Sequence, residues 1–89
     1  MKAIVTVIGK DHIGIIANVC AILASNDINI LDISQTIMHE YFTMIMMVDT
    51  SACSLSFADL ADTLKKSGEE NGLEIRIQRE DIFNAMHRI

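Results

Sequence analysis

Gly9-Lys10-Asp11-His12-Ile13-Gly14 is the stretch that decides the fold, because it separates an apolar strand from an apolar helix. Residues 2–8 before it are dense in Val, Ile and Thr, a pattern typical of a strand buried on both faces. From residue 13 to residue 25, apolar residues recur three and four positions apart, which indicates an amphipathic helix. We expect Asn26 to end this helix, because Asn tolerates the left-handed backbone conformation found at helix ends.

Two further strands follow this helix. Residues 28–38 predict a strand with a bulge, since the apolar residues change from even to odd positions near Leu31. The chain then reverses around His39 and Glu40 into a strand over residues 41–49. Apolar residues occupy both faces of that strand, so we expect both faces to be covered.

The last third of the chain predicts a helix, a strand and a tail. Ser56 and Asp59 resemble a capping box, which begins a helix that ends at Asn71-Gly72. Apolar and polar residues alternate over residues 73–78, as in a half-exposed edge strand. Residues 81–89 form an amphipathic tail with apolar positions at helical spacing, which predicts a short C-terminal helix.

The predicted order β-α-β-β-α-β closes as a ferredoxin-like two-layer sandwich, an α+β fold. It has a four-stranded antiparallel sheet in the order four-one-three-two, with both helices on one face. We expect one domain over residues 1–80 and a separate tail over residues 81–89. The helices cover a single face, so Ile45 and Met47 would be exposed in a monomer, and the sequence predicts a homodimer or a higher homo-oligomer.

Composition excludes several classes of function. Seven basic against twelve acidic residues give a formal net charge of −5, which disfavours direct binding to nucleic acid. Cys20 and Cys53 have no C-x-x-C spacing, so we expect free thiols in a reducing cytoplasm and no disulfide framework. No segment has the pattern of a membrane span or a signal peptide. Neither the histidines nor the methionines predict a metal site, and we expect no cofactor.

The start of the first helix is the candidate binding site. A helix start presents backbone N–H groups without partners inside the helix, together with partial positive charge, and Gly14 would let a ligand come close to them. We expect Asn29 and Asp32 to return to the neighbourhood of this loop, where an amide and a carboxylate could orient polar groups. These groups together suit a zwitterion better than a bare phosphate.

The motif Gly9-Lys10-Asp11-His12-Ile13-Gly14-Ile15-Ile16-Ala17, followed by Asn29-Ile30-Leu31-Asp32-Ile33, resembles the signature of the ACT domain. This resemblance implies a regulatory module that binds amino acids or related metabolites near subunit interfaces and associates side by side or back to back. Residues 79–89 resemble the ending of small stand-alone bacterial ACT proteins. Many family members have Pro before the motif glycine, whereas this chain has Ile13, so its loop lacks a fixed φ angle.

Carried over position by position, the resemblance assigns ligand binding to two segments, the first loop with its helix start and the start of the second strand. It implies no catalytic residues, a small-molecule effector, a further protein target and a signal passed on through oligomer or partner binding. The predicted ligand-binding residues are Asp11, His12, Ile13, Gly14, Ile15, Asn29 and Ile30.

Plainer interpretations stand beside this one. Gly14 could serve only close packing, and Asp11 could be only a helix cap. A dimerisation or adaptor module without a ligand is the main alternative function. A small acylphosphatase-like hydrolase shares the topology, but phosphoryl chemistry needs strong cationic donors, and the first loop offers Lys10 and no Arg.

Overall fold

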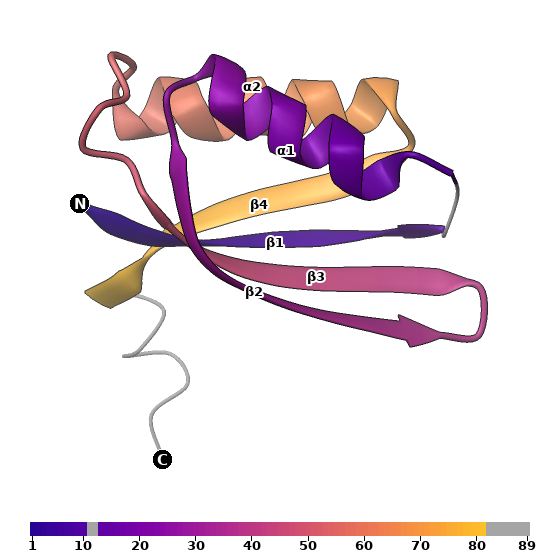
Figure 1. The fold of residues 1–89 in the computed structure, drawn as a ribbon. Helices are drawn as coiled ribbons and strands as arrows, with labels where there is room; N and C mark the ends of the chain where they lie inside the picture. The colour runs from indigo at the N-terminus through magenta and orange to yellow at the C-terminus, as the bar shows by residue number, and fades with distance from the viewer. Residues whose placement is uncertain (11–12, 82–89) are drawn as a thin grey trace.

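A computed structural model describes residues 1–10 and 13–81 of the chain (Figure 1). Six elements follow one another in the predicted order β-α-β-β-α-β. They are β1 (Lys2–Lys10), α1 (Ile15–Ser25), β2 (Asn29–Met38), β3 (Tyr41–Asp49), α2 (Phe57–Glu70) and β4 (Leu73–Arg79).

The four strands form one antiparallel sheet in the order β2-β3-β1-β4, which confirms the predicted strand order. Both helices lie on the same face of this sheet, and the other face carries no described element (Figure 1). The pairing of β2 with β3 shifts register between Ile30 and Asp32, so the bulge predicted near Leu31 is confirmed. β2 and β4 are therefore the two edges of the sheet.

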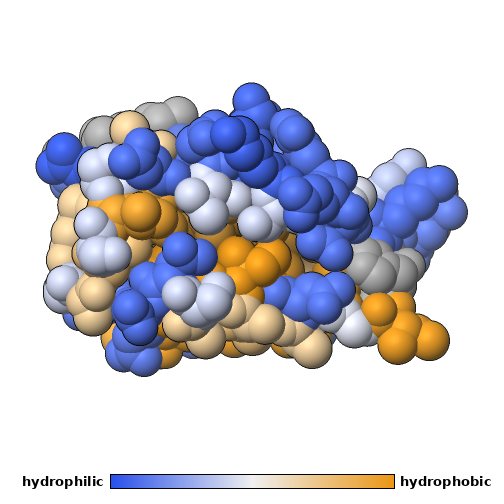
Figure 2. Space-filling view, turned by 90° about the horizontal axis from the view of Figure 1, so that it is seen from above, coloured by the Kyte–Doolittle hydropathy of each residue, from blue (hydrophilic) through white to orange (hydrophobic). Residues whose placement is uncertain are grey.

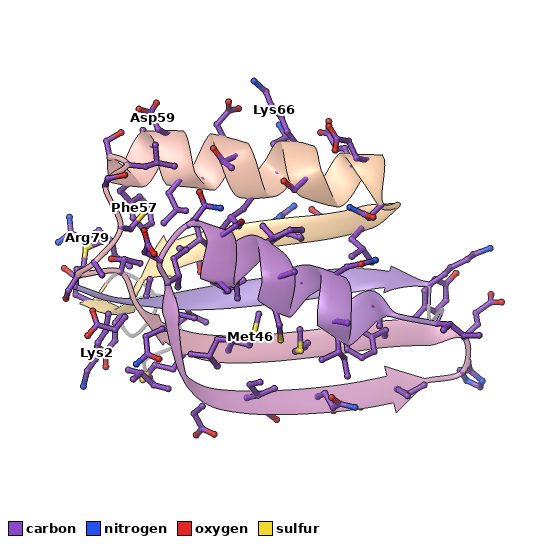
Figure 3. The ribbon with its side chains drawn as sticks, turned by 45° about the horizontal axis from the view of Figure 1, so that its top comes forward. Lys2, Met46, Phe57, Asp59, Lys66 and Arg79 are labelled. Atoms are coloured by element: carbon purple, nitrogen blue, oxygen red, sulfur yellow. The ribbon has the colours of Figure 1, made fainter. Side chains whose placement is uncertain are left out.

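The core lies between the sheet and the helices. Alternate residues of the two central strands, among them Val5 and Val7 of β1 and Met44 and Met46 of β3, are fully buried. Figure 3 shows Met46 lying beneath α1. Both helices place apolar residues three and four positions apart against these strands, as the sequence predicts. The helical residues of the core are Ile15, Val19, Leu23, Leu60 and Leu64.

The second helix begins as predicted. The backbone N–H of Asp59 donates to the Ser56 hydroxyl over 3.2 Å, which confirms Ser56 as the N-cap. Lys66 and Asp62, one turn apart, form an exposed ion pair of 3.0 Å, and the Asp62 carboxylate raises the pKa of Lys66. Asn71 follows the last helical residue, and Gly72 has a φ of +70°.

Three expectations need correction at the first helix. β1 runs on to Lys10 and α1 begins at Ile15, so the loop between them covers residues 11–14 and lies two residues later than the sequence pattern predicts. Asn26 has a φ of −103°, and the left-handed residue that turns the chain is Asp27, with a φ of +59°. The Asn26 side chain instead donates to the carbonyl of Ile22 over 2.8 Å, which satisfies one of the last helical carbonyls.

The predicted C-terminal helix falls mostly outside the described residues. Glu80 and Asp81 are helical, and residues 82–89 are not described. Within the described residues, no helix combines the length and apolar character that crossing a bilayer requires.

Candidate functional site

Gly14 forms the start of α1 in a conformation that favours glycine. Its φ is +84° and its ψ is 5°, in the left-handed region, where any residue with a Cβ atom is strained. A Cβ atom added there would meet nothing within 4 Å, so the backbone angle and not crowding explains the glycine. Because Gly14 is the N-cap, no N-cap side chain accepts from the N–H groups of the first turn.

The residues around Gly14 divide sharply in exposure. Ile15 is buried in the core, while Ile13 is fully exposed and Ile16 is 39% exposed. The first turn of α1 contains no acidic side chain. The helix start therefore keeps its positive partial charge. Asp11 and His12, the remaining predicted residues of this loop, lie outside the described part of the chain.

Asn29 and Ile30 lie at the opposite end of the molecule from Gly14. Asn29 is exposed and pairs across the sheet with Asp49, at the end of the sheet where β1 begins. Gly14 follows the other end of β1, beyond the pairing of Lys10 with Tyr41. The expectation that Asn29 and Asp32 return to the first loop is therefore wrong, because in a single chain the two segments lie at opposite ends of the sheet. The eleven residues of α1 alone account for about 16 Å between the two segments.

Asp32 has a local role instead. Its carboxylate accepts a hydrogen bond from the backbone N–H of Ile33 over 2.9 Å, directly after the bulge. The side chain points to the face of the sheet that the helices leave open, since Asp32 pairs with Met47. This places Asp32 away from the start of α1.

The outer edge of β2 is a feature that the site prediction did not include. We define the β2-edge patch as Leu31, Ile33 and Ile37, which are 45%, 43% and 54% exposed. Natural edge strands usually carry Lys, Pro or other devices against pairing, but residues 29–38 contain no Lys, Arg or Pro. Seen from the helix side, hydrophobic residues gather on the α1 side of the molecule, whereas the α2 side is largely hydrophilic (Figure 2).

The sheet end near Asn29 is held by a hydrogen-bonded cluster at Asp49. One Asp49 oxygen accepts from the Ser51 hydroxyl over 2.5 Å and from the Ser51 backbone N–H over 2.9 Å. The terminal amine of Met1 lies 3.5 Å from the same oxygen. Hydrogen bonds from Ser51, followed by the nearby amine, lower the pKa of Asp49. The cluster joins the start of β1 to the end of β3.

This lowered pKa predicts how acid affects the fold. A carboxyl group with a lower pKa in the folded state stabilises the fold above its unfolded pKa, near 3.9, and loses that contribution as the pH falls through the folded pKa. We expect the difference in melting temperature between the wild type and Asp49→Asn to shrink from pH 6 to pH 2. Ser51→Ala removes the hydrogen bond from the Ser51 hydroxyl to Asp49 and should therefore reduce this pH dependence. A constant difference across this range would contradict the assignment.

Two of the hollows on the described surface include neither Gly14 nor Asn29. One of about 470 Å³ lies along β4 and α2 between Lys65, Glu69 and Arg76. The other, of about 180 Å³, lies on the open face of the sheet and is lined by Ile4, Asp32, Ile33, Ser34, Ile45 and Met47. The described residues contain no cluster of three or more His, Cys, Asp or Glu side chains that could hold a metal ion.

Comparison with known proteins places these features in context. The sequence profile of the ACT domain matches residues 2–78. A UPF0237 protein of Clostridium acetobutylicum is 58% identical over 89 residues, which span the full length of both chains. A UPF0237 protein of Methanocaldococcus jannaschii is 52% identical over 88 residues, covering 99% of this chain and 98% of its own. An ACT domain protein from Streptococcus pneumoniae has a solved structure with a TM-score of 0.84, at 44% identity and 98% coverage of both chains.

Proposed function

Because the chain belongs to the ACT domain family, we propose that it is a non-catalytic regulatory module that binds an amino acid or a related metabolite between two copies. ACT domains are typically regulatory modules that bind small ligands. The observation that carries the proposal is the placement of the two predicted segments, the Gly14 helix start and Asn29, at opposite ends of the sheet.

Antiparallel pairing of two β2 strands would complete the site. If a two-fold axis passes near the middle of the paired β2 strands, the beginning of β2 in one copy lies beside the end of β2 in the other copy. Met38 at the end of β2 pairs with Tyr41, which also pairs with Lys10 just before the first loop. Asn29 of one copy would thus approach the sheet end where the Gly14 loop of the other copy lies. The β2-edge patch would be buried in the same contact.

The chemistry at each segment selects the ligand class. Backbone N–H groups at the start of α1, from Ile15 onward, would hold a carboxylate, with Gly14 permitting close approach. The Asn29 side-chain carbonyl of the second copy would accept from the ligand's ammonium group. Exposed Ile13 and Ile16 offer an apolar surface for the ligand's side chain. Asp11 and His12 complete the proposed set.

Such a site couples ligand binding to assembly. A ligand that contacts two copies binds the dimer better than the monomer, so it shifts the population toward the dimer. Coupling of this kind is typically about 1–3 kcal/mol, which changes the affinity for a downstream protein target by one or two decades.

A thermal-shift screen with the common amino acids and purines, run with sedimentation analysis, tests this function. A ligand at one hundred times its Kd stabilises the folded state by about 2.7 kcal/mol. For a domain of this size that corresponds to a rise in melting temperature of about 10–20 °C. We expect one chemical class to produce this rise and to favour the dimer, and Asn29→Ala to abolish it. Uniformly flat titrations would rule out the ligand.

The β2-edge patch favours a second candidate, an adaptor that assembles without a ligand. Its three exposed apolar side chains offer a surface for pairing that does not depend on the Gly14 loop. An adaptor would form the same dimer at every ligand concentration and would co-purify with a protein target. The screen separates the two functions because only the ligand-binding module responds to a metabolite.

A further inference from the structure

The outer edge of β4 is the second free edge of the sheet, and the proposed function does not use it. β4 pairs with β1 on one side, and no described strand pairs with its other side. A hollow of about 470 Å³ follows this edge beneath α2. We call it the β4-edge groove, which is lined by Lys65 and Glu69 of α2 and by residues 73–76 of β4. An edge strand keeps backbone N–H and C=O groups with which another strand can pair.

Charged side chains of both signs lie in two layers of the β4-edge groove. The apolar residues of β4 are buried on its helix side. Glu74 and Arg76 alternate with them, point to the open face of the sheet and form an exposed ion pair. Lys65 and Glu69 lie one helical turn apart on α2, and both side chains are exposed. Each layer therefore presents one cation and one anion.

We propose that the β4 edges of two copies pair antiparallel about a two-fold axis at Ile75, so that each β4-edge groove receives charged side chains of the other copy. In this register Glu74 lies opposite Arg76 of the second copy on the open face. The axis repeats the same contact with the copies exchanged. Opposite charges directly across two strands stabilise their pairing.

The charges of β4 favour this register over the two neighbouring registers that keep the faces of the sheets aligned. An axis at Arg76 would set the two Arg76 side chains opposite each other. An axis at Glu74 would do the same with the two Glu74 side chains. Like charges directly opposite destabilise a strand pair. The axis at Ile75 avoids both contacts and replaces them with two pairs of opposite charge.

α2 extends this complementarity to the helix layer. Gly68 packs directly on β4, since a Cβ atom there would lie 2.7 Å from the Leu73 carbonyl oxygen and 3.0 Å from Ile75 Cγ1. Lys65 and Glu69 precede and follow Gly68 along α2, about 6 Å apart along the helix axis. A two-fold axis at Ile75 reverses this order in the second copy. Lys65 of each copy therefore faces Glu69 of the other across the groove.

The contact along β4 is expected to be weaker than the proposed contact along β2. Exposed ion pairs each contribute little to stability, and the apolar side chains of β4 are already buried within one copy. Backbone pairing along a strand of seven residues supplies the attraction, and the charges supply the register. The β4 contact would therefore join two β2 dimers only at high protein concentration.

Two charge-reversed proteins test the proposal, both carrying Ile33→Lys to remove the proposed contact along β2. The acidic-edge protein carries Lys65→Glu and Arg76→Glu, and the basic-edge protein carries Glu69→Lys and Glu74→Lys. Each protein alone sets like charges across the two-fold axis, whereas a mixture of the two sets opposite charges again. In sedimentation at about 1 mM protein, we expect the mixture to associate at least about tenfold more tightly than either protein alone.

The design excludes two simpler causes of association. Each reversal changes the net charge of −5 by two, so neither protein becomes net positive and overall charge attraction does not explain a complex. All four reversed side chains are exposed, so the core is not disturbed. Lys66→Glu is the matched control, because Lys66 points away from the sheet (Figure 3) and lies outside the groove. With Ile33→Lys, it should associate as the Ile33→Lys protein does.

Amide NMR of the mixture locates the contact. We expect signals of residues 73–79 to shift on mixing, while those of residues 29–38 stay unchanged. A mixture that does not associate would overturn the proposal, as would equal association of the two separate proteins. Shifts confined to residues outside β4 and α2 would also overturn it. No ligand is added and the proposed β2 contact is removed, so a negative result leaves the proposed function untouched.

Discussion

Ile33→Lys is expected to convert the proposed dimer to a monomer and to remove the proposed response to ligand. Ile33 lies near the middle of β2, so a two-fold axis there sets each Ile33 close to its counterpart. Lysine would place two like charges at this contact and remove an apolar side chain that the proposed dimer would bury. Natural edge strands use such charges against pairing. We expect the dimer to weaken by about a hundredfold, equivalent to about 2.8 kcal/mol, measured by sedimentation over a range of concentrations.

Leu55→Lys is the matched control, since it adds the same charge at a similarly exposed apolar residue away from the edge. It should leave both the dimer and the ligand-induced thermal shift unchanged. An Ile33→Lys protein that remains dimeric would show that the copies associate through another surface. If the variant is monomeric but keeps its ligand-induced thermal shift, the whole site lies within one chain. Asn29 of a second copy would then have no part in ligand binding.

Local pattern was sufficient to predict most of the fold. The alternation over Leu73, Ile75 and Ile77 predicts β4, and all three side chains are buried. The change of apolar parity near Leu31 predicts the bulge because a one-residue insertion moves every later side chain to the other face. The beginning of α1 was less well predicted, since Ile13 matches the helical spacing but precedes the left-handed Gly14.

The arrangement of the candidate site could not be read from local spacing. Only two residues separate the end of α1 at Ser25 from the Ile28–Asn29 step, which favours the idea that Asn29 returns to the first loop. The helix α1, however, carries the chain along its own length away from Gly14, and the short turn after it does not bring the chain back. In a βαβ unit both strands begin at the same end of the sheet, so Asn29 lies beside the start of β1 and away from Gly14. The β-α-β order of the first three elements is therefore sufficient to predict that Asn29 and Gly14 lie apart.

Phe42→Ala should produce the largest loss of stability among single substitutions in the core. Phe42 is 1% exposed and pairs with Gly9 of β1 on one side and Ile37 of β2 on the other. Its side chain belongs to the core cluster between the sheet and the helices. Truncation of a buried Phe typically costs about 3–5 kcal/mol, against a total of about 4–13 kcal/mol for a domain of this length. Urea denaturation measures the loss.

Tyr41→Ala provides the control within the same strand. Tyr41 is the neighbour of Phe42, points to the opposite face and is 50% exposed, so its truncation leaves no buried cavity. We expect a change in the free energy of unfolding below about 1 kcal/mol for Tyr41→Ala. Because Phe42 pairs with Gly9, close to the end of β1 from which the Gly14 loop leaves, Phe42→Ala should also weaken the proposed ligand binding at temperatures where the protein is still folded. Equal losses of stability in the two variants would contradict the assignment of Phe42 to the core and Tyr41 to the surface.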